Sequence, residues 1–124
     1  MIVHVDTSAL VDALTGPRRS LDELIALTGQ GHRLMLSTIV LYEWLRGPRT
    51  PVELAAQDEL FPSEAAVSFG VAEASLASSL YRQLPRARGR ELDLAVAACA
   101  LVAGGALWTL NRSDFRDIPN LRLV

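Results

Sequence analysis

The sequence contains one cysteine, no lysine and no long apolar run, and each absence excludes a class of protein. The single cysteine cannot form a disulfide within the chain, so the fold is not a disulfide scaffold. No apolar stretch approaches the roughly 20 residues that cross a bilayer. The formal net charge of −2 excludes a protein that coats nucleic acid by charge alone, because such proteins carry a basic surface.

The sequence also indicates where the protein is located in the cell and what role its single cysteine has. Residues 1–6 lack the basic segment of a secretory signal and reach a carboxylate at Asp6. We therefore expect the protein to stay in the cytoplasm. Cys99 lies among alanines, and we interpret it as a small packed core residue rather than a reactive thiol.

What the sequence does have is enough apolar material for one core. Hydrophobic residues make up 50% of its 124 positions, so we expect a single domain over residues 1–124. All twelve basic residues are arginine. Arginine suits bidentate phosphate contacts, but codon preference explains its use equally well, so this choice carries no weight by itself.

Short apolar runs alternate with helical patterns along the chain. This alternation, without hairpin turns, predicts an α/β fold whose central parallel sheet of four or five short strands has helices on both faces. Ser20 and Glu23 form a capping-box pattern at the start of the second helix. We expect strands at residues 2–5, 33–37, 106–108 and 121–124, and helices at 8–14, 20–29, 38–46, 51–59, 71–84 and 91–103.

Two acids stand out near the expected strand ends, where sites form in parallel sheets. Asp6 directly follows the first strand, although it could instead cap the helix behind it. Glu43 is the only charge in residues 39–45 and shares a helix face with Ile39 and Val40. A half-exposed helix end could also contain such a charge.

Two further acids complete the pattern. Asp93 interrupts the apolar face formed by Val96, Ala97 and Ala100, so a metal, an arginine or a helix-start position must stabilise it there. Asp114 lies among turn-forming residues and could equally cap a short turn. A structural explanation must account for each acid separately, whereas one Mg²⁺ or Mn²⁺ site for phosphodiester hydrolysis accounts for all of them.

Four segments occur in the order and spacing of a known family. They are Val5–Leu10, Ser37–Glu43, Gly89–Ala98 and Leu107–Leu121. On these segments the chain resembles the PIN-domain ribonucleases, and among them the VapC toxins of VapBC toxin–antitoxin pairs. The resemblance covers essentially the whole chain. It departs from the family at Leu110, where an arginine is usual, and matches poorly at residues 61–70.

This resemblance implies a PIN-like fold and a metal-dependent endoribonuclease. Asp6 and Asp93 would be the most direct ligands of Mg²⁺ or Mn²⁺, while Glu43 and Asp114 would complete the cluster and position water or a second ion. The residues supporting that cluster would be Ser8, Thr109 and Asn111. The resemblance further implies an RNA substrate, a homodimer and inhibition by a VapB-like antitoxin.

Several arginines flank the proposed site in the sequence. We hypothesise that they rim a cleft and hold RNA phosphates, although a solvated basic edge explains them as well. They are Arg46, Arg49, Arg86, Arg88 and Arg90. His4 and His32 have no carboxylate or cysteine at ligand spacing and receive no catalytic role, and Trp44 and Trp108 are expected in the core.

Three other interpretations were weighed against the nuclease. A catalytically degenerate PIN-fold module that binds RNA or an antitoxin would be favoured by loss of an acid, and none is lost. An aspartyl-phosphate phosphatase needs a second aspartate where Ser8 stands. A receiver-like signalling domain needs a lysine near its phosphorylated aspartate, and the chain contains no lysine.

Overall fold

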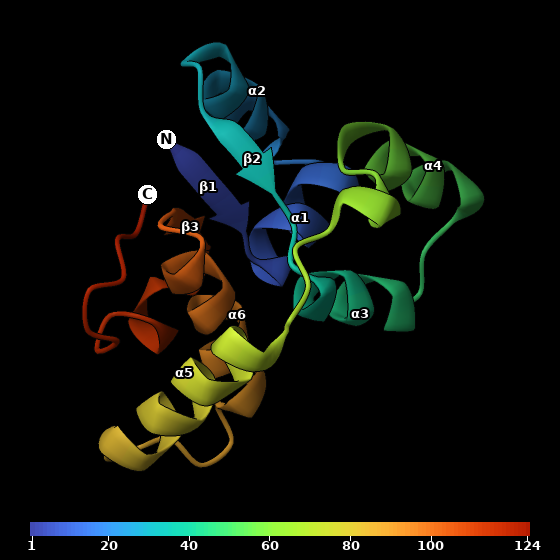
Figure 1. Cartoon of the computed structure of the whole chain (residues 1–124). Coiled ribbons are helices and arrows are strands. Elements are labelled where there is room, and N and C mark those ends of the chain that lie inside the picture. The colour runs from blue at the N-terminus through green and yellow to red at the C-terminus, as the bar shows by residue number, and fades with distance from the viewer.

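A three-stranded parallel sheet forms the centre of the computed structural model, which describes residues 1–124. The strands are β1 (Ile2–Val5), β2 (Arg33–Met35) and β3 (Ala106–Trp108), arranged in the order β2-β1-β3 (Figure 1). Val3 pairs with Leu34 on one side and with Ala106 on the other. The α/β class and the parallel sheet are confirmed.

The sheet has three strands rather than the expected four or five. Residues 121–124 do not form a full strand. Leu123 makes one isolated bridge with Leu107. The Leu107 N–H donates to the carbonyl oxygen of Arg122, and the Leu107 carbonyl oxygen accepts from the N–H of Val124. The strand expected at residues 121–124 is therefore wrong: the segment meets β3 at one residue only, so no ladder develops.

Six α-helices surround the sheet, and their ends agree closely with the expected ones. Ser37 begins α3 with a cap, because its Oγ accepts a hydrogen bond from the Val40 N–H at 3.2 Å. Thr50 and Glu53 form a capping box at α4. The helices are α1 (Thr7–Leu14), α2 (Leu21–Gly29), α3 (Thr38–Arg46), α4 (Pro51–Leu60), α5 (Val71–Gln83) and α6 (Glu91–Val102), with short 3₁₀ turns η1 (Ser63–Ala65) and η2 (Arg112–Asp114).

The capping box expected at Ser20 is wrong, although α2 does begin there. Ser20 makes no side-chain cap and instead donates from Oγ to Asp12 Oδ2 at 2.5 Å. Arg19 also donates to Asp12, so this carboxylate holds the α1–α2 connection together. A partner eight residues away therefore displaced the local cap, as tertiary contacts often do.

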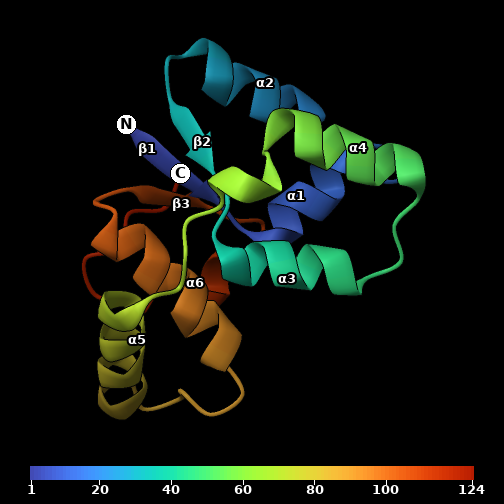
Figure 2. The same ribbon diagram turned by 45° about the vertical axis from the view of Figure 1, so that its right-hand side comes forward.

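The helices form two groups around the strands. In both ribbon views, α2 lies above the sheet and α1, α3 and α4 lie to its right, while α5 and α6 lie together below it (Figures 1 and 2). The core between them includes Trp44, Trp108 and the free, buried Cys99, as expected. Every residue from Leu94 to Ala100 is buried, so α6 is the most enclosed helix. No helix is both long and apolar enough to span a membrane.

Parallel strands place the candidate acids at one edge. Asp6 ends β1 and leads into α1, Ser37 and Thr38 lead from β2 into α3, and Thr109 follows β3. The three carboxyl ends therefore meet beside the starts of α1 and α3. This is the edge at which parallel sheets build their sites.

The close approach of β1 and β3 predicts a stability effect at Gly105. A Cβ at this position would lie 2.8 Å from the Ile2 carbonyl oxygen, so Gly105→Ala must push the two strands apart. We expect it to lower the free energy of unfolding by about 1–3 kcal/mol in urea denaturation.

Gly29→Ala is the matched control for that substitution. Gly29 lies at the end of α2 with nothing within 4 Å of its added Cβ, so this change should leave stability unchanged or raise it by about 0.5–1 kcal/mol. Equal effects of the two substitutions would contradict the close approach.

Candidate active site

Asp6 is the buried acid of the site, with 5% of its surface exposed. It occupies the N-cap position of α1, but its side chain caps nothing. Instead, Oδ2 accepts hydrogen bonds from Ser8 Oγ at 2.9 Å and Thr109 Oγ1 at 2.7 Å. Oδ1 accepts none within the chain. Two hydroxyls thus fix the orientation of this carboxylate and leave one oxygen free to bind a ligand.

Those two hydroxyls belong to a small network that joins β1 to β3. Ser8 Oγ and Thr109 Oγ1 lie 3.3 Å apart, and each accepts a backbone N–H, from Leu110 and Asn111 respectively. Asn111 is exposed and joins the network through its backbone, while its side chain makes no hydrogen bond. Ser8 and Thr109 therefore touch Asp6 directly, and Asn111 supports it through Thr109.

Glu43 reaches the same edge from α3. Its Oε1 accepts a hydrogen bond from Thr7 Oγ1 at 2.8 Å, and its Oε2 lies 3.7 Å from Nη2 of Arg46. Its side chain is 18% exposed. Sequence reasoning did not single out Thr7, because the contact joins residues 36 positions apart and depends on how α1 crosses α3.

Asp93 carries the clearest electrostatic signature of a shared site. It lies in the first turn of α6 and makes no hydrogen bond within the chain. Its pKa is raised to about 6, mainly by burial and then by the negative charges of Asp6, Asp114 and Glu43, in that order. Arg90 opposes this shift. The four acids are therefore electrostatic neighbours, although they come from four separate elements.

Asp114 is the exposed member of the four. It ends η2, and its side chain makes no hydrogen bond. Its neighbours Phe115 and Ile118 are 1% and 3% exposed, so they anchor this segment in the core. Asp114 thus lies at the rim of the site, on a segment whose other side is fixed by apolar packing.

The carboxylates are suited by chemistry to a hard divalent cation. Mg²⁺ and Mn²⁺ favour carboxylate oxygen, and Asp6 Oδ1 and the Asp93 carboxylate are free of hydrogen bonds. As the side chains stand, no group of three or more His, Cys, Asp or Glu side chains could hold a metal ion. Like charges repel without a cation, so a bound ion would draw the Asp93 carboxylate closer to Asp6, whose orientation is already fixed.

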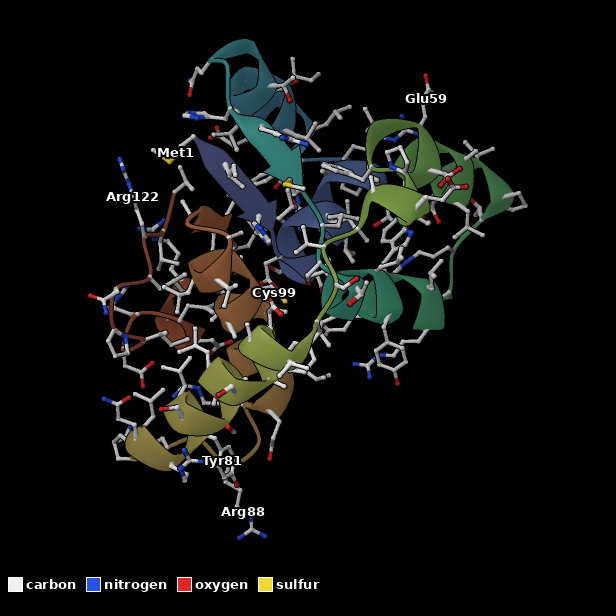
Figure 3. The ribbon with its side chains drawn as sticks, viewed as in Figure 1. Met1, Glu59, Tyr81, Arg88, Cys99 and Arg122 are labelled. Atoms are coloured by element: carbon white, nitrogen blue, oxygen red, sulfur yellow. The ribbon has the colours of Figure 1, made fainter.

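The five candidate arginines differ in their surroundings. Arg49 donates to the carbonyl oxygens of Trp44 and Pro48 and stacks over the Trp44 ring at 4.3 Å. Arg46 is 52% exposed beside Glu43. Arg86 and Arg88 are exposed, and Arg88 projects from the far tip of the α5–α6 connection (Figure 3).

Arg90 is bound within the protein rather than free for a ligand. Its guanidinium makes a bidentate pair with Asp117, at 2.9 Å and 2.6 Å. Asp117 was not identified from the sequence, since the pair joins residues 27 positions apart. A second acid three residues after Asp114 was the only local signal.

Comparisons with known proteins agree on one family. A family model described as PIN domain matches residues 3–121. No curated protein matches the sequence. The structure of DNA-bound VapBC from Salmonella typhimurium is similar at 19% identity and a TM-score of 0.80, covering 100% of this chain and 97% of that one.

Two further solved structures share the fold. VapBC2 from Rickettsia felis, bound to a DNA fragment from its promoter, gives 22% identity and a TM-score of 0.76, with coverage of 100% and 98%. FitAcB from Neisseria gonorrhoeae gives 18% identity and a TM-score of 0.70, with coverage of 99% and 96%. At these identities the likeness concerns the fold.

The raised pKa of Asp93 predicts how stability depends on pH in EDTA. Folded Asp93 keeps its proton up to about pH 6, whereas its ordinary pKa is 3.8. The folded state therefore holds the extra proton in this window, and its stability falls as pH rises from 4 to 6. Asp93→Asn should raise the free energy of unfolding at pH 7.5 by roughly 1–2 kcal/mol, allowing for solvent screening.

Glu59→Gln provides the control for that measurement. Glu59 is exposed on α4 and points away from the rest of the chain (Figure 3), so neutralising it should leave stability unchanged. An Asp93→Asn protein that is no more stable than the wild type at pH 7.5 would show that burial and repulsion together do not destabilise the charged form of Asp93.

Proposed function

This chain belongs to the PIN domain family, and from that membership we propose that it is a Mg²⁺- or Mn²⁺-dependent endoribonuclease, the VapC-type toxin of a toxin–antitoxin pair. Members of this family are generally nucleases that use divalent metal ions. The observation that carries the proposal is the mutual repulsion of Asp93 with Asp6, Asp114 and Glu43. Such repulsion destabilises the empty site and is relieved when a cation binds.

Each acid has a role that follows from its surroundings. Asp6 and Asp93 would bind the ion, because they combine burial or partial burial with carboxylate oxygens that no hydrogen bond occupies. Glu43, held by Thr7, orients the attacking water. Asp114, exposed at the rim, completes the cluster on the solvent side. When bound, Mg²⁺ or Mn²⁺ supplies a Lewis acid that polarises the phosphodiester and lowers the pKa of its water.

The hydroxyls of Ser8 and Thr109 prepare Asp6 for this task. They fix Oδ2, so Oδ1 already points in one direction. The side chain therefore loses little conformational freedom when a cation binds. Asp6 is buried, so little water surrounds its carboxylate. A cation therefore interacts with this carboxylate more strongly than it would with an exposed one. The two hydroxyls thus act through Asp6 rather than on the substrate.

The RNA would be held by local positive charge, since the whole chain is acidic. Arg86 and Arg88 are exposed and can each pair with a phosphate. Arg46 is exposed too but lies beside Glu43 and over the Tyr42 ring, and Arg49 and Arg90 make hydrogen bonds within the protein. Few phosphate contacts imply a weak dependence of binding on salt.

We propose a VapB-like antitoxin as the physiological partner and a homodimer as the assembly. The support for the antitoxin is the repeated likeness to solved VapBC complexes over the whole chain. Exposed apolar side chains on α3, among them Tyr42 at 56% and Leu45 at 52%, give the chain a surface that a protein partner could cover.

Cleavage of a mixed RNA pool tests the nuclease directly. The purified protein should cut RNA with Mg²⁺ or Mn²⁺ and lose activity in EDTA. Asp93→Asn should lower the rate by about 100-fold or more, because it removes a charged ligand of the ion. Gel analysis of labelled RNA measures both.

Asp22→Asn is the isosteric control for that experiment. Asp22 is exposed on α2, away from the carboxyl edge of the sheet, and its substitution should leave cleavage intact. Equal cleavage by Asp93→Asn would point to contamination or to a different site. Absence of cleavage by the wild type with a range of RNAs would favour a degenerate module that binds RNA or an antitoxin.

The toxin role predicts a matched result in living cells. Induced expression of the wild-type chain should arrest bacterial growth, whereas Asp93→Asn should not, because the variant folds but lacks the metal ligand. Co-expression of a cognate VapB-like antitoxin should restore growth. Arrest by both forms alike would contradict a toxin that acts through this site.

A further inference from the structure

Arg90 connects the two acidic elements that no strand pairing connects. It immediately precedes α6, which carries Asp93, and its Nη2 donates to the backbone carbonyl of Asp114 at 2.7 Å. The same guanidinium holds Asp117, three residues beyond Asp114, by two hydrogen bonds. From the start of α6, this one side chain thus holds both the end of η2 and the turn that follows it.

The hydrogen bonds of Arg90 leave no accessible N–H group for a substrate. A guanidinium has five N–H groups. Two point from Nη1 to Arg86 O at 3.4 Å and Asp117 Oδ2 at 2.9 Å, and two point from Nη2 to Asp114 O and Asp117 Oδ1. The fifth, on Nε, is buried without a partner. A phosphate could bind here only by displacing Asp117.

The burial of this side chain indicates that its position matters. Its Nε is an unsatisfied buried donor, which costs stability, and the Arg90 side chain is 18% exposed against 45% for Asp117. An arginine serving only as a solvated charge would turn this donor to water. The hydrogen bonds from the Arg90 guanidinium to Asp114 and Asp117 outweigh the cost of this unpaired donor.

We propose that Arg90 and Asp117 form a clamp that positions Asp114 against Asp93, so that Arg90 is a positioning residue of the site and not a contact to RNA. The inference rests on the proposed function, because it assumes that Asp114 and Asp93 serve one metal centre. Without the clamp, η2 keeps its apolar anchors Phe115 and Ile118 but loses its tie to α6.

The charge of Arg90 has a second consequence at the same place. The Asp93 and Asp114 charges both raise the pKa of Arg90, after the larger effect of its hydrogen bonds to Asp117. Arg90 in turn opposes the raised pKa of Asp93. It therefore offsets part of the repulsion between these acids while its own hydrogen bonds stay with the backbone and Asp117.

Two conservative variants separate the clamp from a simple charge. Arg90→Lys keeps the positive charge but cannot make the bidentate pair, and Asp117→Asn keeps the shape but loses the charge. Each should lower kcat for RNA cleavage by about 10- to 100-fold while KM changes little, and each should weaken Mn²⁺ binding measured by electron paramagnetic resonance. The double variant should be little worse than either single one, because both break one interaction.

Hydrogen exchange provides a readout that needs neither RNA nor metal. The amides of Asp114 and Phe115 should exchange faster in both variants than in the wild type, while amides in α6 beyond its first turn remain protected. Arg82→Gln is the control, since this exposed arginine in the last turn of α5 makes no hydrogen bond to Arg90 or Asp117. It should alter neither exchange at η2 nor Mn²⁺ affinity.

Several outcomes would overturn the clamp. Unchanged exchange at Asp114 would show that Arg90 does not hold η2, and unchanged Mn²⁺ affinity and kcat would show that holding η2 does not matter. A raised KM with unchanged kcat, and a salt slope smaller by about one, would identify Arg90 as a phosphate contact. If the wild type neither cleaves RNA nor binds Mn²⁺, the proposed function fails, and the wild-type protein alone reveals this.

Discussion

Repulsion between carboxylates at one edge of a small sheet is the constraint around which this fold is organised. The four acids come from separate parts of the chain: Asp6, Glu43, Asp93 and Asp114. The charges of the other three contribute to the raised pKa of Asp93. A metal-free protein must hold these charges together against their tendency to separate. It does so with rigid surroundings: buried strands beneath the edge, hydroxyls on Asp6 and Glu43, and an arginine between Asp93 and Asp114.

The three supports differ in how they work. Ser8 and Thr109 orient a buried carboxylate with neutral hydrogen bonds, so they stabilise its charge without cancelling it. Arg90 places a full positive charge near the cluster but directs its hydrogen bonds to Asp117 and to a backbone oxygen. The net negative charge of the edge therefore survives, and it remains available to a cation. Direct pairing of Arg90 with Asp93 would have neutralised it.

Much of this could be predicted from the sequence, because the decisive signals were local. Residues 38–46 form α3 as expected, since Ser37 caps the helix and Gly47-Pro48 follows its end. The strand-end rule singled out Asp6, whereas Thr109 was expected near it only from the resemblance to the PIN-domain family. Long-range pairs escaped prediction: Ser20 turned to Asp12 and left the α2 cap empty, and Arg90 met Asp117. Such pairings depend on how elements cross, which no short motif encodes.

The order of the site along the chain has a consequence for how the protein is made. Asp6 directly follows the first strand, yet its partner Thr109 and the rim acid Asp114 lie more than a hundred residues later. β1 is the middle strand and lacks one neighbour until β3 has been synthesised. A growing chain on the ribosome therefore carries no complete acidic cluster until nearly all of it has emerged. Under the proposed function, the translation machinery is thus not exposed to nuclease activity while the chain is still growing.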